Sequence, residues 1–411
     1  MIGLKAALWL ATTIAGTLSL SYHIMNPTPE TLASSPFTQE TIGFFGKYTS
    51  GLETVGLHPN ICLVKHQPVI LSLFLRNIEL EDIPEKIEPG LRIQQIRISG
   101  YVLESPKPSE LAPSQTFHKL MKLLHALGEV QVDKLHLKKF NMIEDGPATA
   151  IPLTRMNELA FYEVSPFFLE WFCEIVDLSG CTFEFNLMIV NCGVESVHCL
   201  SKLGISTLKG LNLSDLPKLT QLDCQMPNTT KDNELTLCAD PLVLNLSTDI
   251  VDLIAEAAWK RIVVNMDIWN KIVSVPGTKN IVAELLVLEV TDWKDFQVNG
   301  HVQRTAQARM IDIYDIRNET VLSKAFFMDV FGWMYENAEG VEMVRILVLY
   351  AKSVDLEIKT FLEDNDPIDQ SRLPSLKTLM VEFAQNNFVW SNTSRPKVND
   401  NSQNGLAATA I

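Results

Sequence analysis

The feature that most constrains the fold is a short hydrophobic pattern that recurs along most of the chain. One copy is LPKLTQLDC, residues 216–224, in which three leucines follow each other at intervals of three, and Leu222 and Cys224 then flank a single aspartate. A spacing of three is typical of a helical or coiled arc, whereas alternation is typical of a strand. The pattern L-x-x-L-x-L therefore predicts a turn that leads into a short strand.

Thirteen copies of this pattern occur at a nearly regular interval. Their middle hydrophobic residues are Leu73, Ile96, Leu135, Leu159, Val176, Val197, Leu222, Leu242, Ile262, Leu286, Ile311, Leu347 and Leu379. From Leu135 to Ile311 most intervals match the length of one coil of a repeat, about 20–29 residues. A competing copy, Leu208, Leu211 and Leu213, lies too close to Leu222 to form a coil of its own, so we place it on the returning side of its coil. Such a repeat predicts a stack of similar coils.

A stack of coils also suits the length and composition of the chain. The protein has 411 residues, of which 46% are hydrophobic and 20% charged, which is sufficient for a continuous core. A layered fold of this length would divide into two or more domains. A solenoid can remain one quasi-linear unit, because each coil packs only on its neighbours. We therefore expect one long solenoid domain.

The repeats resemble the leucine-rich repeat family over residues 65–385. This resemblance implies an α/β solenoid, a curved horseshoe with a parallel β-sheet on its concave face and helices and irregular coils on its convex face. The family places Asn or Cys three residues after the last leucine, where it bonds the backbone of the neighbouring coil. In this chain only Cys181 matches that position, so we expect irregular coils.

The flanking segments differ from the repeats. Residues 1–21 have one lysine and then about fifteen apolar or small residues, which predicts a signal peptide or, alternatively, an uncleaved signal anchor. Residues 22–64 are expected to form an N-terminal cap, residues 65–385 about 13 irregular repeats, and residues 386–411 a disordered polar tail. No apolar segment after the leader is long enough to cross a membrane. The apolar stretch 321–340 is interpreted as the convex layer of a long repeat.

Glycosylation motifs and cysteines bear on the cellular compartment. Asn-x-Ser/Thr motifs occur at Asn212, Asn228, Asn245, Asn318 and Asn392, and Asn245 is the least suitable because it is expected within a strand. Of the seven cysteines, Cys173, Cys199 and Cys224 occupy hydrophobic positions of the repeat, where a free thiol acts as a small buried hydrophobe. The motifs are compatible with a secretory route, and for these three cysteines we favour core positions over a disulfide framework.

The sequence gives little indication of chemistry. It contains no glycine-rich phosphate loop, no H-E-x-x-H and no G-x-S-x-G, and its histidines do not group with cysteines, so we expect no cofactor and no metal. The carboxylates of Glu163, Glu174, Asp177 and Asp223 are predicted to lie near one another, more as solvated surface than as a catalytic group. A net charge of −15 disfavours nucleic acid, whose phosphates require basic surface.

The outward-facing column of the predicted sheet is the candidate binding surface. Reading the residue between the last two hydrophobic positions of each copy gives candidate partner-binding residues at Arg97, His136, Asp177, His198, Asp223, Val243, Val263, Val287, Asp312 and Val348. The column is polar in its first half and apolar in its second. Exposed valines would mark a partner site, but a slip of one residue in register would place the same valines in the core.

These observations favour a secreted, non-enzymatic repeat protein that binds a protein partner through its concave face. In layout it is similar to the divergent secreted repeat proteins that intracellular parasites release toward their hosts. One alternative is an intracellular or membrane-anchored adaptor of the ubiquitin-ligase type. A more remote alternative is a hydrolase inserted in the repeat frame that uses the acidic group near Asp177.

Overall fold

The fold is known from a computed structural model of the chain. It describes residues 39–48, 70–87, 92–100, 113–128, 130–141, 150–153, 155–181, 184–229, 232–290, 296, 303–315, 320–348, 351–354, 361, 368–369, 371–383 and 386–391. Residues 1–21, predicted to form a signal peptide or anchor, lie outside these ranges. Of the helices in the described ranges, none has both the length and the apolar character that crossing a bilayer requires.

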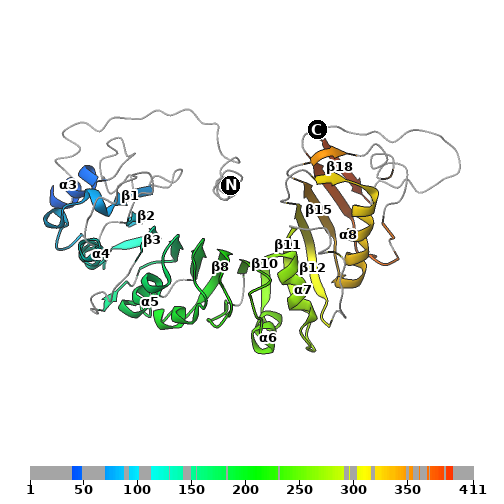
Figure 1. Cartoon of the computed structure of the whole chain (residues 1–411), viewed down its shortest axis with the longest axis horizontal. Helices are drawn as coiled ribbons and strands as arrows, with labels where there is room; N and C mark the ends of the chain where they lie inside the picture. Colours follow the sequence, from blue (N-terminus) through cyan, green and yellow to red (C-terminus); the bar gives the residue numbers. More distant parts are fainter. Residues whose placement is uncertain are drawn as a thin grey trace.

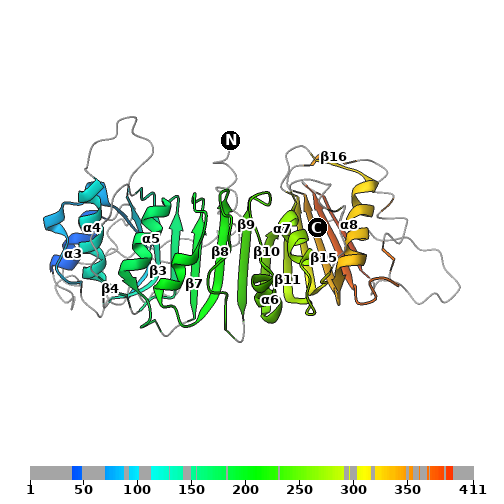
Figure 2. The ribbon, with the colours of Figure 1, turned by 60° about the horizontal axis from the view of Figure 1, so that its bottom comes forward.

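One long sheet runs through the molecule in sequence order. Its twelve parallel strands are β1 (Ile70–Phe74), β2 (Arg92–Ser99), β3 (Gln131–Lys138), β5 (Glu158–Tyr162), β7 (Phe185–Val190), β8 (Leu208–Leu216), β9 (Asn233–Ala239), β10 (Ala258–Asn265), β11 (Ile281–Val290), β12 (Ala306–Asp315), β15 (Met343–Val348) and β17 (Thr378–Phe383). The short β14 (Ala338–Glu339) pairs with β12, and β18 (Asn386–Ser391) ends the sheet antiparallel to β17. Figures 1 and 2 show the strands side by side along an arc. The architecture is an α/β solenoid-like fold with a long, curved parallel sheet.

Each parallel strand places two hydrophobic residues, separated by one residue, on the convex side of the sheet. Leu135 and Leu137 of β3 pair with Leu159 and Phe161 of β5, for example. Equivalent pairs in all twelve strands, from Leu71 and Leu73 to Leu379 and Val381, are at most 2% exposed. Because side chains alternate along a strand, the residue between the two points to the opposite, concave side.

Helices and irregular coils cover the convex side, as Figure 1 shows. The helices are α3 (Gln39–Tyr48), α4 (Pro113–Leu127), α5 (Pro166–Ile175), α6 (Thr248–Glu256), α7 (Met266–Ser274) and α8 (Lys324–Asn337), with 3-10 turns η1 (Leu75–Asn77), η2 (Leu80–Asp82) and η3 (His198–Leu203). Ser165, Ser247 and Ser323 cap α5, α6 and α8 by accepting a backbone hydrogen bond in the first turn. In α8 the side chains of Phe327, Phe331 and Trp333 are buried, so stretch 321–340 packs on the convex side as expected.

Shorter ladders connect the coils away from the main sheet. Strand β4 (Ile151–Pro152) pairs with β6 (Val176–Asp177), and β13 (Thr320–Leu322) pairs with β16 (Ala351–Val354). Further along the chain, Gln221 bridges Ser196 on one side and Asn245 on the other. Returning segments therefore stack with nearly the same period as the main strands.

This stacking corrects the predicted repeat register. Seven of the thirteen copies of the pattern, around Ile96, Leu135, Leu159, Ile262, Leu286, Ile311 and Leu379, coincide with strands of the main sheet. The copies around Val176, Val197, Leu222 and Leu242 belong to returning segments, so LPKLTQLDC is not a main strand. The copy around Leu211, which we had placed on the returning side, is strand β8. The copies around Leu73 and Leu347 were out of register, since Leu71 and Leu73 pair with Ile96 and Ile98, and Val344 pairs with Ile311.

The flanking regions also depart from expectation. Helix α3 lies within the expected cap, residues 22–64, and packs near β1. Residues 386–391 form β18, so the predicted disordered tail was placed too early. Residues after 391 lie outside the described ranges.

Candidate functional site

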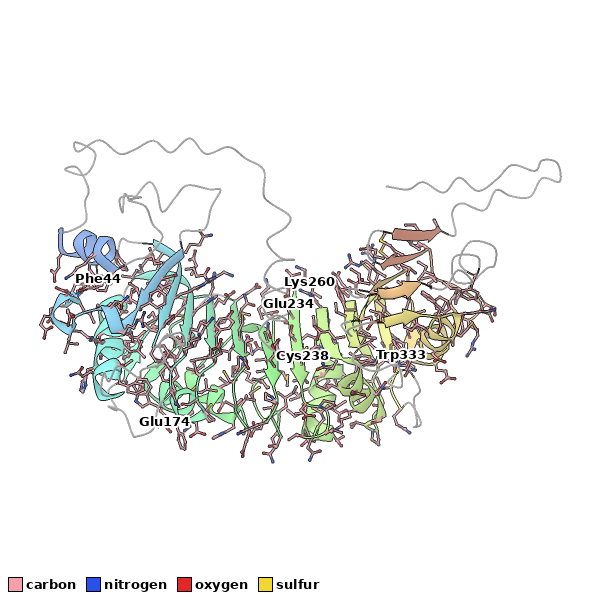
Figure 3. All side chains as sticks on the ribbon, turned by 45° about the horizontal axis from the view of Figure 1, so that its top comes forward. Phe44, Glu174, Glu234, Cys238, Lys260 and Trp333 are labelled. Atoms are coloured by element: carbon pink, nitrogen blue, oxygen red, sulfur yellow. The ribbon has the colours of Figure 1, made fainter. Side chains whose placement is uncertain are left out.

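The concave face of the sheet presents a continuous row of side chains from the middle residue of each strand. Strand pairing defines this central row as Ser72, Arg97, His136, Ala160, Met188, Asn212, Thr236, Val263, Val287, Asp312, Arg345 and Met380. Figure 3 looks obliquely into this side of the arc, with Cys238 near its middle and Glu174 on the outer side. The central row and its flanking rows form the candidate site.

Five of the predicted binding residues lie in the central row. They are Arg97, His136, Val263, Val287 and Asp312.

The other five were misplaced by the register. Asp177 lies in β6, His198 in η3, and Asp223 and Val243 in returning segments. Val348 is in β15 but only 3% exposed on the core side, and Arg345 takes its place in the row.

The N-terminal half of the face contains a buried polar network around His136. Gln95 Nε2 lies 2.9 Å from His136 Nδ1, and His136 Nε2 lies 2.9 Å from Glu158 Oε1. Lys134 Nζ donates to the other carboxylate oxygen of Glu158 at 2.8 Å. Burial opposes ionisation of Glu158, but the hydrogen bonds from His136 and Lys134 outweigh it and lower its pKa. Since both imidazole nitrogens have partners, the network fits a structural role for His136.

The C-terminal half of the face is apolar, but its accessible hydrophobic residues are not the valines that we predicted. Val263 and Val287 face away from the core, yet they are only 1% and 3% exposed. The accessible hydrophobic side chains lie in the neighbouring row, where Leu285, Met310 and Met343 are adjacent on β11, β12 and β15 and only half-buried. We call these three residues the apolar row.

Beyond it, Val389 of β18 is paired with Met380 and is 56% exposed.

An ion pair lies beside the apolar row. The guanidinium of Arg345 on β15 donates to both carboxylate oxygens of Asp312 on β12, and also to the hydroxyl of Tyr314 at 3.3 Å. The Asp312 side chain is 2% exposed and that of Arg345 34%. A buried carboxylate held by a two-pronged guanidinium fixes the geometry of this part of the face.

Cys238 and Glu289 form a second polar group, partly buried, in the next row. Cys238 Sγ lies 3.5 Å from Glu289 Oε2, and Asn265 of β10 occupies the position between them in the row. Burial raises the pKa of Glu289, and the negative charge of Asp215 acts in the same direction. Burial also raises the pKa of the Cys238 thiol, with a contribution from Glu289, so this cysteine is not an activated nucleophile.

The raised pKa of Glu289 predicts a pH-dependent effect of Glu289→Gln. A carboxyl whose pKa is raised on folding favours the folded state at low pH, and this contribution is lost as the pH rises through the folded-state value. We expect the variant and the wild type to have similar stability at pH 4, and the variant to be more stable at pH 8. Thermal melts of both proteins across this range test the expectation. A difference that stays constant with pH would contradict it.

The remaining predicted groups are dispersed. Glu163 Oε1 lies 3.7 Å from Lys138 Nζ, and Glu174 forms an ion pair with Lys202. The carboxylate of Asp177 accepts a hydrogen bond from the backbone N–H of Ser179, and that of Asp223 accepts one from the hydroxyl of Ser196. Within the described ranges, no group of three or more His, Cys, Asp and Glu residues is placed to hold a metal ion. The acidic cluster expected from the sequence is therefore not assembled.

The glycosylation candidates have distinct environments. Asn212 is in β8 and its amide oxygen accepts a hydrogen bond from Ser214, whereas Asn245, which we expected within a strand, is exposed and forms an isolated bridge with Gln221. Asn228 uses its side chain to bond the backbone of Leu208 and Ser206 in the preceding coil. Asn318 and Asn392 lie outside the described residues. Asn245 is therefore more accessible than Asn212.

The described cysteines are free thiols. Cys173, Cys181, Cys192, Cys199 and Cys224 are buried, in agreement with the expected core positions of Cys173, Cys199 and Cys224. Cys181 Sγ donates to the carbonyl of Leu153 at 3.1 Å, and the backbone N–H of Val164 donates to Cys192 Sγ at 3.4 Å. Two thiols thus bond the backbone of neighbouring coils. Cys62 lies outside the described residues.

Comparisons with protein families, with curated proteins and with solved structures gave no match.

Proposed function

We propose that the protein is a secreted, non-enzymatic leucine-rich-repeat protein that binds a protein partner on its concave face. The observation that carries the binding proposal is the apolar row. Its three hydrophobic side chains are adjacent and accessible, and they line the concave surface of a curved sheet, which can surround a partner. Methionine side chains are flexible and polarizable, and they adapt to the shape of a partner.

Two observations support the repeat family. Successive parallel strands are commonly one repeat length apart along the chain, as the paired residues Leu187, Leu211 and Leu235 illustrate. Cys192 follows Ile189 by three positions and contacts the backbone of the preceding coil, which is the position and role that the family gives to Asn or Cys. Several other coils place buried apolar residues at this position, such as Phe140, Val164 and Leu216, which accounts for the weak family pattern.

The binding proposal predicts that charge in the apolar row abolishes partner capture without unfolding the protein. The variant Met310→Lys with Met343→Lys places two ammonium groups on half-buried strand positions. In a cross-linked pull-down, we expect this double variant to recover at most one tenth of the partner that the wild type recovers. The control is Met328→Lys on α8, where the wild-type side chain is 51% exposed on the convex side.

Equal recovery of the partner by the double variant and the wild type, with an unchanged melting temperature, would contradict the binding proposal.

The secretion proposal is tested separately, by sequencing the N-terminus of protein recovered from the medium of secreting cells. Retention of residues 1–21 in a cell-associated product would instead favour the anchored alternative.

A further inference from the structure

Arg261 extends the apolar row by one strand. It lies on β10 and pairs directly with Leu285 of β11, so Arg261, Leu285, Met310 and Met343 occupy one line across four neighbouring strands. Adjacent strands are about 4.8 Å apart, and the line is therefore about 14 Å long. An extended peptide covers this distance in about four residues.

The charge of Arg261 is not neutralised by the described residues. Its Nε atom is buried without a hydrogen-bond partner, and the guanidinium forms no ion pair within the described ranges. Burial raises the pKa of Glu289 and of Tyr314, and the positive charge of Arg261 is close enough to oppose part of that rise.

Among the described residues, none of the nearby acidic groups forms an ion pair with Arg261. Asp312 is held by Arg345, and Glu289 accepts a hydrogen bond from the thiol of Cys238. Glu234 is the neighbour of Arg261 on β9, yet no salt bridge joins the two side chains. On the same strand Asn265 Oδ1 is also buried without a partner. This part of the face therefore contains a guanidinium that forms no ion pair with a described residue, beside hydrophobic side chains.

We infer that the partner presents an extended segment in which an Asp or Glu carboxylate pairs with Arg261 and hydrophobic side chains in the next four residues cover Leu285, Met310 and Met343. This inference rests on the proposed concave binding function and specifies the chemistry of its ligand. Arginine suits the role because its planar fork binds a carboxylate through two parallel hydrogen bonds. The hydrophobic neighbours exclude water and strengthen that pair.

The test uses the full chain and a displayed library of random seven-residue peptides. Peptides selected on the wild type should be enriched in Asp or Glu within four residues of two large hydrophobic residues. On Arg261→Gln the acidic preference should disappear while the hydrophobic preference remains. The control Arg309→Gln removes the same charge from an exposed position at the start of β12, and it should select the same peptides as the wild type.

The inference can also be tested without altering the protein. In a peptide selected on the wild type, replacement of the acid by its amide should weaken binding at least tenfold, which remains measurable if Arg261→Gln fails to fold. Acidic enrichment that persists on Arg261→Gln, an amide peptide that binds equally well, or no enriched peptides would each overturn the inference. Hydrophobic peptides that depend on Met310 but are indifferent to Arg261 would overturn it while leaving the proposed function intact.

Discussion

Replacing Arg304 with methionine is expected to lower the free energy of unfolding by about 2–4 kcal/mol, since the backbone carbonyls that accept hydrogen bonds from its buried guanidinium lose their donor. The Arg304 side chain is 0% exposed. It donates to the carbonyls of Val275 at 3.1 Å and Pro276 at 2.9 Å, and it pairs with Asp252 of α6. Arg304 thus joins the end of α7 and helix α6 to the segment before β12.

Chemical denaturation followed by tryptophan fluorescence measures this effect, with Arg309→Met as the matched control. The wild-type Arg309 side chain is 67% exposed, and we expect its loss to change stability by no more than about 0.5 kcal/mol. Gly277→Ala is a second variant that disturbs the same contacts without removing the arginine, because an added Cβ would overlap the Arg304 guanidinium. Equal midpoints for Arg304→Met and Arg309→Met would show that the buried contacts do not stabilise the fold.

The second large effect is expected from Leu235→Asp, which should destabilise the protein by about 4 kcal/mol or more. Leu235 lies in β9 with 0% exposure, and a carboxylate there would be buried without a partner. Leu242→Asp should change stability by no more than about 0.5 kcal/mol, because Leu242 is 92% exposed. The measurement is the same denaturation experiment.

This pair of variants also distinguishes the observed register from the register read from the sequence. The L-x-x-L-x-L pattern placed Leu242 in a main strand. If that register were correct, Leu242→Asp would be the damaging change.

The sequence predicted the architecture better than the register, and the reason is physical. Every ladder of a solenoid repeats with the length of the coil, whether it belongs to the main sheet or to a returning segment. Gln221, for example, bridges Ser196 and Asn245, each of which lies about one coil length away along the chain. The spacing therefore predicted stacked coils correctly, but it could not tell which ladder forms the main sheet. In strands β10 to β12 the predicted register was correct.

The candidate site was predictable only in part for the same reason. Val263, Val287 and Asp312 follow from a correct register, whereas Arg345 was missed because the copy around Leu347 was out of register. The apolar row was missed because we read only the residue between the last two hydrophobic positions, although Leu285, Met310 and Met343 precede those positions by one residue. Reading a second outward column would have found them. The partner of Arg345, and the lack of a partner at Arg261, depend on contacts across strands that no local pattern encodes.

The reversal of chain direction at β18 ends the parallel part of the sheet. A further coil of the same kind would need a parallel neighbour at the growing end, but β18 runs antiparallel to β17 and offers its hydrogen-bonding groups in the opposite polarity. The last described strand therefore ends the parallel stacking of the coils, and duplicated coils are expected to be accommodated by insertion before it.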